Sequence, residues 1–572
     1  MDLARQDRDH ERDQAGTAPD GPAGRSGGAA ASRRLEAAVL VAVNLPIVVA
    51  AWRGLARGFQ PLGDNGMLLV RARDVATGHH PLLGSWSSSS AVLDQNLNNP
   101  GPLYSDAIAL PIKVLGPWVG LAVGVMLVNM AASTIAVVLA RRIGGASTLV
   151  AVAAGVVAVQ WIMGSELLYD IWQPNALMLP MMAFLVAVTC LATGDLAMAP
   201  WVVGIGSLLV QTHLSNLPVV ALLVVASAAF GGWRIRRTGE RPEWRRPARW
   251  TVAVAVLAWI QPVVEQVTSA GRGNMSRLAS AGTGGGGEAI GLSRAVRLVA
   301  EAVVVQPWFT RGSFVDAVPP GVQGHDIAGL VPFGRGLLVT AVLVLGLAVV
   351  AGMCWRSGRR SLATMVGTSA FALVGAVAAV AVSPLNVVGT TPHQMRWLWP
   401  IAAFATAAVL AAALDALRSW PRPGRWALTG AVAMVLAVSA ATLPTHVSDG
   451  LFTSPTVDAE AYLPAARELV GDLDELAGRG TVLYDPTGIP FADPYSGLVW
   501  AELQDQDVPF VFDDEVLIRH FGESRRAGRT AALRLWEAFG PEALDPPPGA
   551  ERVGFADGPT GPVALLVEPI DR

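Results

Sequence analysis

The sequence predicts an α-helical polytopic membrane protein with about 11 transmembrane helices and a soluble C-terminal α/β domain. Of its 572 residues, 52% are hydrophobic and 15% are charged, whereas soluble chains carry about 25% charged residues. The hydrophobic residues cluster in runs of about 20, the length of helix that crosses the hydrocarbon core of a bilayer. The net charge of −3 gives no basic surface of the kind that binds nucleic acid, so we expect no nucleic-acid partner.

Each expected span is an apolar run bounded by polar or arginine-containing segments. The fifth is short, so the count is 10 or 11. The runs cover residues 35–52, 117–140, 147–164, 174–193, 199–212, 215–232, 250–269, 335–355, 362–383, 398–417 and 426–444.

Arginine placement predicts the orientation, because cytoplasmic loops carry an excess of basic residues. The segment 233–249 holds seven arginines and is expected in the cytoplasm. We therefore expect a protein of a bacterial plasma membrane with its N-terminus on the cytoplasmic side. An odd number of spans then places the C-terminus on the outer side. The expected parts are a disordered N-terminus at 1–34, a transmembrane domain at 35–444 with large outer loops at 53–116 and 270–334, and an extracytoplasmic domain at 445–572.

The segment 445–572 alternates short β-like runs with helical stretches, which is typical of a small α/β domain. It is acidic, with 23 Asp or Glu against nine Arg. Strands are expected at Thr481–Tyr484, Val508–Phe512 and Val563–Val567. Helices are expected at Ala459–Leu476 and Arg525–Phe539.

The first outer loop contains the main candidate for catalysis, Asp64. It opens a stretch with helical periodicity, in which we expect Met67, Leu68, Val70 and Val75 to lie against the membrane. One interpretation is that Asp64 only caps this helix. The other is that Asp64 is a general base at the membrane–water interface, where a carboxylate takes the proton from an attacking hydroxyl.

Polar residues at other expected outer positions form candidate sugar- or acceptor-binding groups. Polar groups near the depth of the lipid are costly and usually face a cavity or a partner. An interfacial anchoring role is the alternative for each cluster. The candidates are His79, His80, Asn99, Asp170, Asn175, Gln211 and His213.

Arg396 is the candidate for holding a phosphate, with His393 beside it. Arg396 lies on the expected outer side, against the trend for basic residues, and a guanidinium fork suits a phosphodiester. The alternative is that Arg396 reaches lipid headgroups.

A set of motifs in this sequence resembles the GT-C class of integral membrane glycosyltransferases, and more narrowly its actinobacterial members. The resemblance covers most of 35–420 in layout, and its sharp motifs span about 40 residues. They are Gly63-Asp64, Arg73-Asp74-Val75, Gly78, Pro81, Gly84, Asn99-Pro100-Gly101-Pro102-Leu103-Tyr104, Gly116, Gln173-Pro174-Asn175, Gln211-Thr212-His213, and His393 with Arg396 before Trp399-Pro400.

The resemblance implies transfer of a hexose or pentose from a polyprenyl-phosphate-sugar to a hydroxyl of an envelope glycan or lipid outside the cytoplasm. It implies that Asp64 is the base, and that Arg396 and His393 stabilise the departing phosphate. Asn65 and Asn99 depart from the family pattern, and we expect no cofactor or metal. Asp74, Asp94 and Asp106 are alternative carboxylates in the same loop, and Asp74 has Arg71 as a neighbour for pairing.

Two other classes of function remain open. A transporter or lipid flippase would carry ionisable residues in the middle of its spans and inverted repeats. An inactive envelope scaffold would use the C-terminal domain to bind partners.

Overall fold

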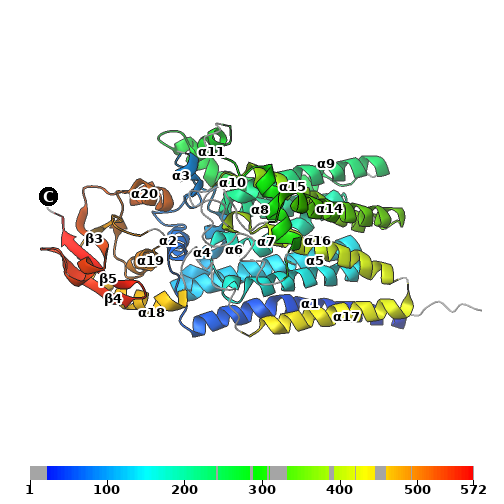
Figure 1. The fold of residues 1–572 in the computed structure, drawn as a ribbon, viewed down its shortest axis with the longest axis horizontal. Helices are drawn as coiled ribbons and strands as arrows, with labels where there is room; N and C mark the ends of the chain where they lie inside the picture. The colour runs from blue at the N-terminus through cyan, green and yellow to red at the C-terminus, as the bar shows by residue number, and fades with distance from the viewer. Residues whose placement is uncertain are drawn as a thin grey trace, which may run out of the picture.

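The computed structural model describes residues 22–93, 95–239, 242–283, 288–305, 308–309, 331–385, 392–418, 420–444, 459–490 and 493–570. Long helices lie side by side along one half of the molecule, and the strands lie at the other end (Figure 1). Ten helices make up this bundle in the described part of the chain: α1 (Pro22–Ala56), α5 (Pro117–Met163), α7 (Met178–Ala192), α8 (Ala199–Thr212), α9 (Leu217–Thr238), α10 (Arg245–Thr268), α14 (Phe333–Arg356), α15 (Arg360–Val382), α16 (Leu398–Leu417) and α17 (Pro421–Thr442).

The chain is a multi-pass membrane protein. Within the described residues, nine helical stretches are long and apolar enough to cross a bilayer, and Leu196–Thr212 is a shorter apolar stretch. The backbone of α5 leaves the helical conformation at Gly144 and Gly145, and Gly145 has φ 67°, which favours glycine. With this break and the shorter stretch counted, a helix lies at each of the eleven predicted spans.

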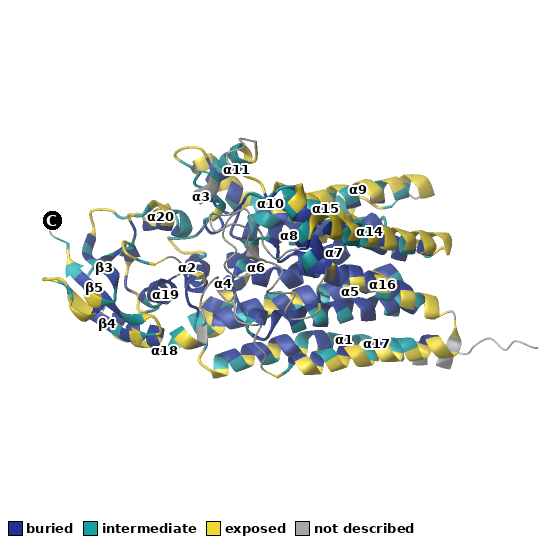
Figure 2. Cartoon of the chain, in the orientation of Figure 1, coloured by how far each residue is buried: buried dark blue, intermediate teal, exposed yellow. Residues whose placement is uncertain are grey.

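The bundle helices differ in how much of their apolar surface is buried. Apolar side chains are exposed on the outer faces of α1, α9 and α14, where they face lipid (Figure 2). In contrast, α7 is buried along its full length. The helix α1 also begins at Pro22, within the segment expected to be disordered. Its residues before the span include the run Ala29-Ala30-Ala31, and alanine favours helix.

Short helices gather at one end of the bundle, which we call the loop end. It is the end at which α1 finishes and α2 begins. The helices there are α2 (Asp64–Asp74), α3 (Ser89–Leu93), α4 (Leu103–Leu115), α6 (Gln173–Ala176) and α11 (Asn274–Thr283), while α12 (Leu292–Ala300) packs against α14 and α15.

The C-terminal domain, residues 459–570, lies against the loop end (Figure 1). Its five strands run in the order β2-β1-β3-β5-β4, with β1 parallel to β2 and β3, and β5 antiparallel to β3 and β4. The elements are α18 (Ala459–Leu469), β1 (Thr481–Asp485), α19 (Ser496–Asp505), β2 (Phe510–Val511), α20 (Glu515–Phe521), β3 (Ala531–Phe539), α21 (Pro541–Leu544), β4 (Glu551–Gly558) and β5 (Gly561–Pro569).

The prediction of a helix at Arg525–Phe539 is wrong. Residues Ala531–Phe539 form β3, the central strand of the sheet, between β1 and β5. Its Leu, Arg, Glu and Ala residues favour helix locally. Pairing on both edges and burial of Leu535 and Ala538 override that preference.

Candidate functional site

Asp64 is the first residue of α2 and does not act as its cap. The N-cap position is Gly63, and no side-chain hydrogen bond caps this helix. The Asp64 carboxylate is exposed, and its Oδ2 accepts a hydrogen bond from the indole Nε1 of Trp172 across 3.3 Å. The structure therefore does not support the interpretation of Asp64 as a helix cap.

Trp172 joins Asp64 to Arg396. The guanidinium carbon of Arg396 lies 5.4 Å from the centre of the Trp172 ring, within the range of a cation–π interaction. Arg396 follows the short helix η5 (Pro392–Met395) and is 1% exposed. Three residues far apart in the sequence thus form one constellation at the loop end.

Asp170 is the buried carboxylate of this constellation. Asn65 donates a hydrogen bond to Asp170 Oδ1 across 2.7 Å, and Asn175 donates one to Oδ2. The backbone N–H of Trp172 also donates to Oδ1, across 3.2 Å. Asp170 thus holds Asn65, which follows Asp64 in the chain, and the backbone of Trp172. It therefore fixes the positions of the two residues that meet in the Asp64–Trp172 contact.

The three charged groups have perturbed acid–base properties. Desolvation by the surrounding protein raises the pKa of the Asp64 carboxyl, and the hydrogen bond from Trp172 partly opposes this rise. Burial raises the pKa of Asp170 to about 7, against the hydrogen bonds it accepts and the charge of Arg396. Burial lowers the pKa of Arg396 to about 9, and the charge of Asp170 opposes this effect. Such shifts are typical of functional sites.

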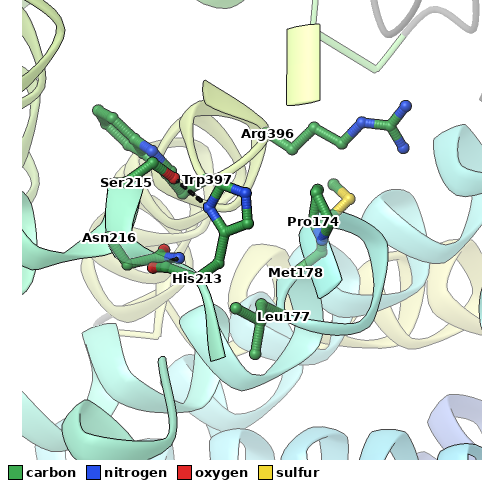
Figure 3. Close-up of a pocket in the computed structure, with 8 residues that line it drawn as sticks. All are labelled: Pro174, Leu177, Met178, His213, Ser215, Asn216, Arg396 and Trp397. Atoms are coloured by element: carbon green, nitrogen blue, oxygen red, sulfur yellow. Dashed lines mark hydrogen bonds between the residues drawn. The ribbon is translucent and has the colours of Figure 1, made fainter. Parts of the chain in front are cut away.

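A small pocket of about 10 Å³, room for roughly one water molecule, adjoins Arg396. His213 faces it, and its Nδ1 lies 2.6 Å from Ser215 Oγ. Figure 3 shows the stem of Arg396 at the rim, with its guanidinium pointing away from His213. Burial lowers the pKa of His213 to about 4, so its ring is neutral at pH 7. The lining residues are Pro174, Leu177, Met178, His213, Ser215, Asn216, Arg396 and Trp397.

Two other predicted binding residues hold the loop end together. Asn99 accepts a hydrogen bond from the backbone N–H of Leu214 across 2.8 Å and donates to Ser85. Gln211 donates to the backbone carbonyl of Ala258 across 2.7 Å. Both side chains are buried: Asn99 joins the first loop to Leu214, just after α8, and Gln211 joins α8 to α10.

His79 and His80 lie beyond the opposite end of α2 from Asp64. His79 Nδ1 is 3.1 Å from Ser524 Oγ in the C-terminal domain. His80 Nδ1 accepts a hydrogen bond from the backbone of Ala76 across 2.9 Å. A helix of this length separates its ends by roughly 16 Å, so the structure does not bring these histidines to Asp64.

Two of the alternative carboxylates of the first loop, Asp74 and Asp106, already have partners. Asp74 forms a buried ion pair with Arg525, 2.8 Å between Oδ1 and Nη2, where the sequence indicated Arg71. Asp106 accepts a hydrogen bond from Gln261 across 2.8 Å. Asp94 and the side chain of His393 lie outside the described residues. Within the described part, no three or more His, Cys, Asp or Glu side chains gather as a metal site would require.

Trp172 and Asn65 were not assigned roles from the sequence, and the C-terminal domain was expected to shape an acceptor groove or, in a scaffold, to bind partners. Trp172 stands in a polar cluster with Asp170 and Asn175, but its contact with Asp64 links segments 108 residues apart. Spacing within a single loop could not show that contact.

Comparison with known proteins gives one structural likeness. No protein-family model matches the sequence, and no curated protein matches it. The chain is similar to the crystal structure of ArnT from Cupriavidus metallidurans bound to undecaprenyl phosphate. The sequence identity is 12% and the TM-score is 0.45, with 93% of this chain and 97% of that chain covered.

Proposed function

We propose that this protein is a membrane glycosyltransferase that moves a sugar from a polyprenyl-phosphate donor to a hydroxyl of an envelope acceptor. The observation that carries the proposal is the constellation of Asp64, Trp172 and Arg396 at the loop end of an apolar bundle. It offers a carboxylate open to an acceptor and a cation close to the end of the membrane-spanning helices, where a lipid phosphate would lie.

The proposed reaction is a single displacement. The carboxylate of Asp64 takes the proton from the acceptor hydroxyl while the hydroxyl oxygen attacks the anomeric carbon. The bond from that carbon to the phosphate oxygen breaks, and polyprenyl phosphate leaves with the bonding electrons. Arg396 stabilises the charge of the departing phosphate. Attack opposite the leaving group inverts the anomeric centre.

The perturbed pKa of Asp64 suits this role. A general base works best when its pKa lies close to the working pH, and the protein raises the pKa of Asp64 in that direction. The hydrogen bond from Trp172 orients the carboxylate and limits the rise. Asp170, in turn, raises the pKa of Arg396 when its carboxyl is ionised, and so opposes the effect of burial on that guanidinium.

The bundle helices favour an enzyme over a transporter. A transporter is expected to place ionisable residues in the middle of its spans. In the candidate spans of the described chain, the charged residues lie near span ends or at the break in α5, as Arg141, Glu265 and Asp415 do. The polar constellation described above lies instead at the loop end.

The test is a transfer assay with purified protein and radiolabelled polyprenyl-phosphate sugars. We expect Asp64→Asn to lower the transfer rate by about 100-fold or more, the contribution typical of a general base. Asp106→Asn, in the same loop, is the matched control and should retain activity. Arg396→Ala should weaken donor binding, and Arg396→Lys should weaken it less.

Two outcomes would contradict the proposal. Full activity of Asp64→Asn would show that Asp64 is not the general base of the reaction. A wild-type protein that neither binds nor consumes any lipid-linked sugar would favour the transporter or scaffold.

A further inference from the structure

The C-terminal domain contacts the backbone immediately before Asp64. Gly63 donates its N–H to the carbonyl of Pro494 across 3.0 Å. A Cβ placed on Gly497, in α19, would lie 1.8 Å from the carbonyl oxygen of Gly63. A Cβ on Gly66 would lie 2.1 Å from the carbonyl oxygen of Gly497. Two main chains therefore touch at a place that admits only glycine.

The backbone conformation of Gly63 also favours glycine at this contact. Its φ is 51°, a region that L side chains rarely adopt, and it directs the chain into α2 with Asp64 next. The start of α19 is in turn held by Asp493, whose Oδ2 accepts hydrogen bonds from the backbone N–H groups of Tyr495 and Ser496.

The opposite end of α2 is fastened to the same domain. Asp74 pairs with Arg525 through two hydrogen bonds, of 2.8 Å to Nη2 and 3.1 Å to Nε, and both side chains are buried. Gln504 donates to the same carboxylate across 2.7 Å. Arg73 pairs with Asp505 across 2.9 Å.

Between its two ends, α2 packs into the core of the C-terminal domain. Met67, Leu68 and Val70 belong to one apolar cluster with Leu498 and Val499 of α19. The expectation that these α2 side chains face the membrane is therefore wrong. Isolated helices of 11 residues are marginal in water, so the ordering of α2 depends on this partner.

We infer that the C-terminal domain is a positioning element for Asp64: the α19 backbone at Gly497 and the side chain of Arg525 hold α2 at its two ends and so set the place of the Asp64 carboxylate. This inference rests on the proposed function of Asp64. Catalytic groups must be held within about 0.5 Å of their working position, and a domain fastened at both ends of a short helix can do this.

The test uses the full-length protein in detergent and compares two glycine-to-alanine variants of the same domain. Gly497→Ala forces the Gly63 carbonyl away. Gly528→Ala is the matched control, because a Cβ at Gly528 meets nothing within 4 Å. The first measurement is hydrogen exchange of the α2 amides. The second is the pH dependence of the transfer rate and the donor KM.

We expect Gly497→Ala to speed exchange in α2 and leave exchange in the bundle unchanged. Its transfer rate should fall by about 100-fold, as a 1 Å misplacement can cause, with donor KM changing much less. The acid limb of its pH profile should also move, because Asp64 shifts relative to Trp172. Gly528→Ala should match wild type in every measurement.

A second pair of variants keeps the test decisive if Gly497→Ala unfolds. Arg525→Met combined with Asp74→Asn, which leaves no unpaired buried charge, should speed exchange in α2 and slow transfer, and Arg525→Lys should change both less. Unchanged α2 exchange and unchanged transfer in Gly497→Ala and in this double variant would overturn the inference. Faster α2 exchange in a protein whose wild type transfers no sugar would instead overturn the proposed function alone.

Discussion

Trp172 donates its indole N–H to the carboxylate of Asp64 across 3.3 Å. Asp64 begins α2, and Trp172 lies in the segment before α6. The same indole ring lies against the guanidinium of Arg396. One side chain therefore fixes the distance between the proposed base and the proposed phosphate-binding cation.

Trp172→Phe removes the hydrogen bond to Asp64 and keeps an aromatic ring beside Arg396. This hydrogen bond lowers the pKa of Asp64, so its loss should raise that pKa further. The acid limb of the pH–rate profile should then move upward by about half to one pH unit, for a bond worth about 1 kcal/mol. Trp172→Leu should also raise the donor KM. A profile that stays in place in Trp172→Phe would show that the bond does not tune Asp64.

Asp170 should make the stability of the protein depend on pH. Its pKa is raised to about 7 by burial, so the fold favours the protonated form. Its contribution is fully present below pH 4 and is lost as the pH rises through about 7. The melting temperature of wild type should therefore fall relative to that of Asp170→Asn between pH 4 and 8. Asp545→Asn, which changes an exposed carboxylate, is the control. Parallel curves for wild type and Asp170→Asn would contradict this prediction.

Arg525→Met should destabilise the protein strongly. It leaves the buried carboxylate of Asp74 without its guanidinium partner, a change that typically costs about 3–5 kcal/mol. Adding Asp74→Asn removes the uncompensated charge and should recover much of the loss. Chemical unfolding followed by circular dichroism measures both. An equal loss in the single and double variants would mean that the charge of Asp74 is not the cause.

The double variant His79→Ala, His80→Ala should retain transfer activity within about twofold, as expected for substitutions away from buried networks. These histidines contact Ser524 and Ala76 beyond the far end of α2. The transfer assay with Asp64→Asn alongside gives the comparison. A loss of transfer rate as large as that of Asp64→Asn would show that the two histidines take part in the reaction.

The loop end is predicted to lie outside the cytoplasm. Cys190 and Cys354 are both buried, so the wild-type chain offers a low background for thiol labelling. Gly528→Cys should react with a membrane-impermeant maleimide on intact cells. Labelling of this variant only after the cells are opened would show that the loop end lies in the cytoplasm.

The sequence by itself determined the bundle and named the charged members of the site. Hydropathy is a local property of about 20 residues, so every predicted span has a helix at its position. Asp64, Asp170 and Arg396 were identifiable as polar groups in segments that adjoin the expected spans.

The tertiary structure decided the partners. Local preference predicts a helix across Ala531–Phe539, and pairing with β1 and β5 makes it a strand. Asp74 has Arg71 nearby in sequence, yet Arg525 is its partner because the C-terminal domain packs on α2. Periodicity showed that α2 has an apolar face, but not that this face meets protein and not lipid. Contacts between residues hundreds of positions apart depend on which buried surfaces fit, and no local pattern in the chain records that fit.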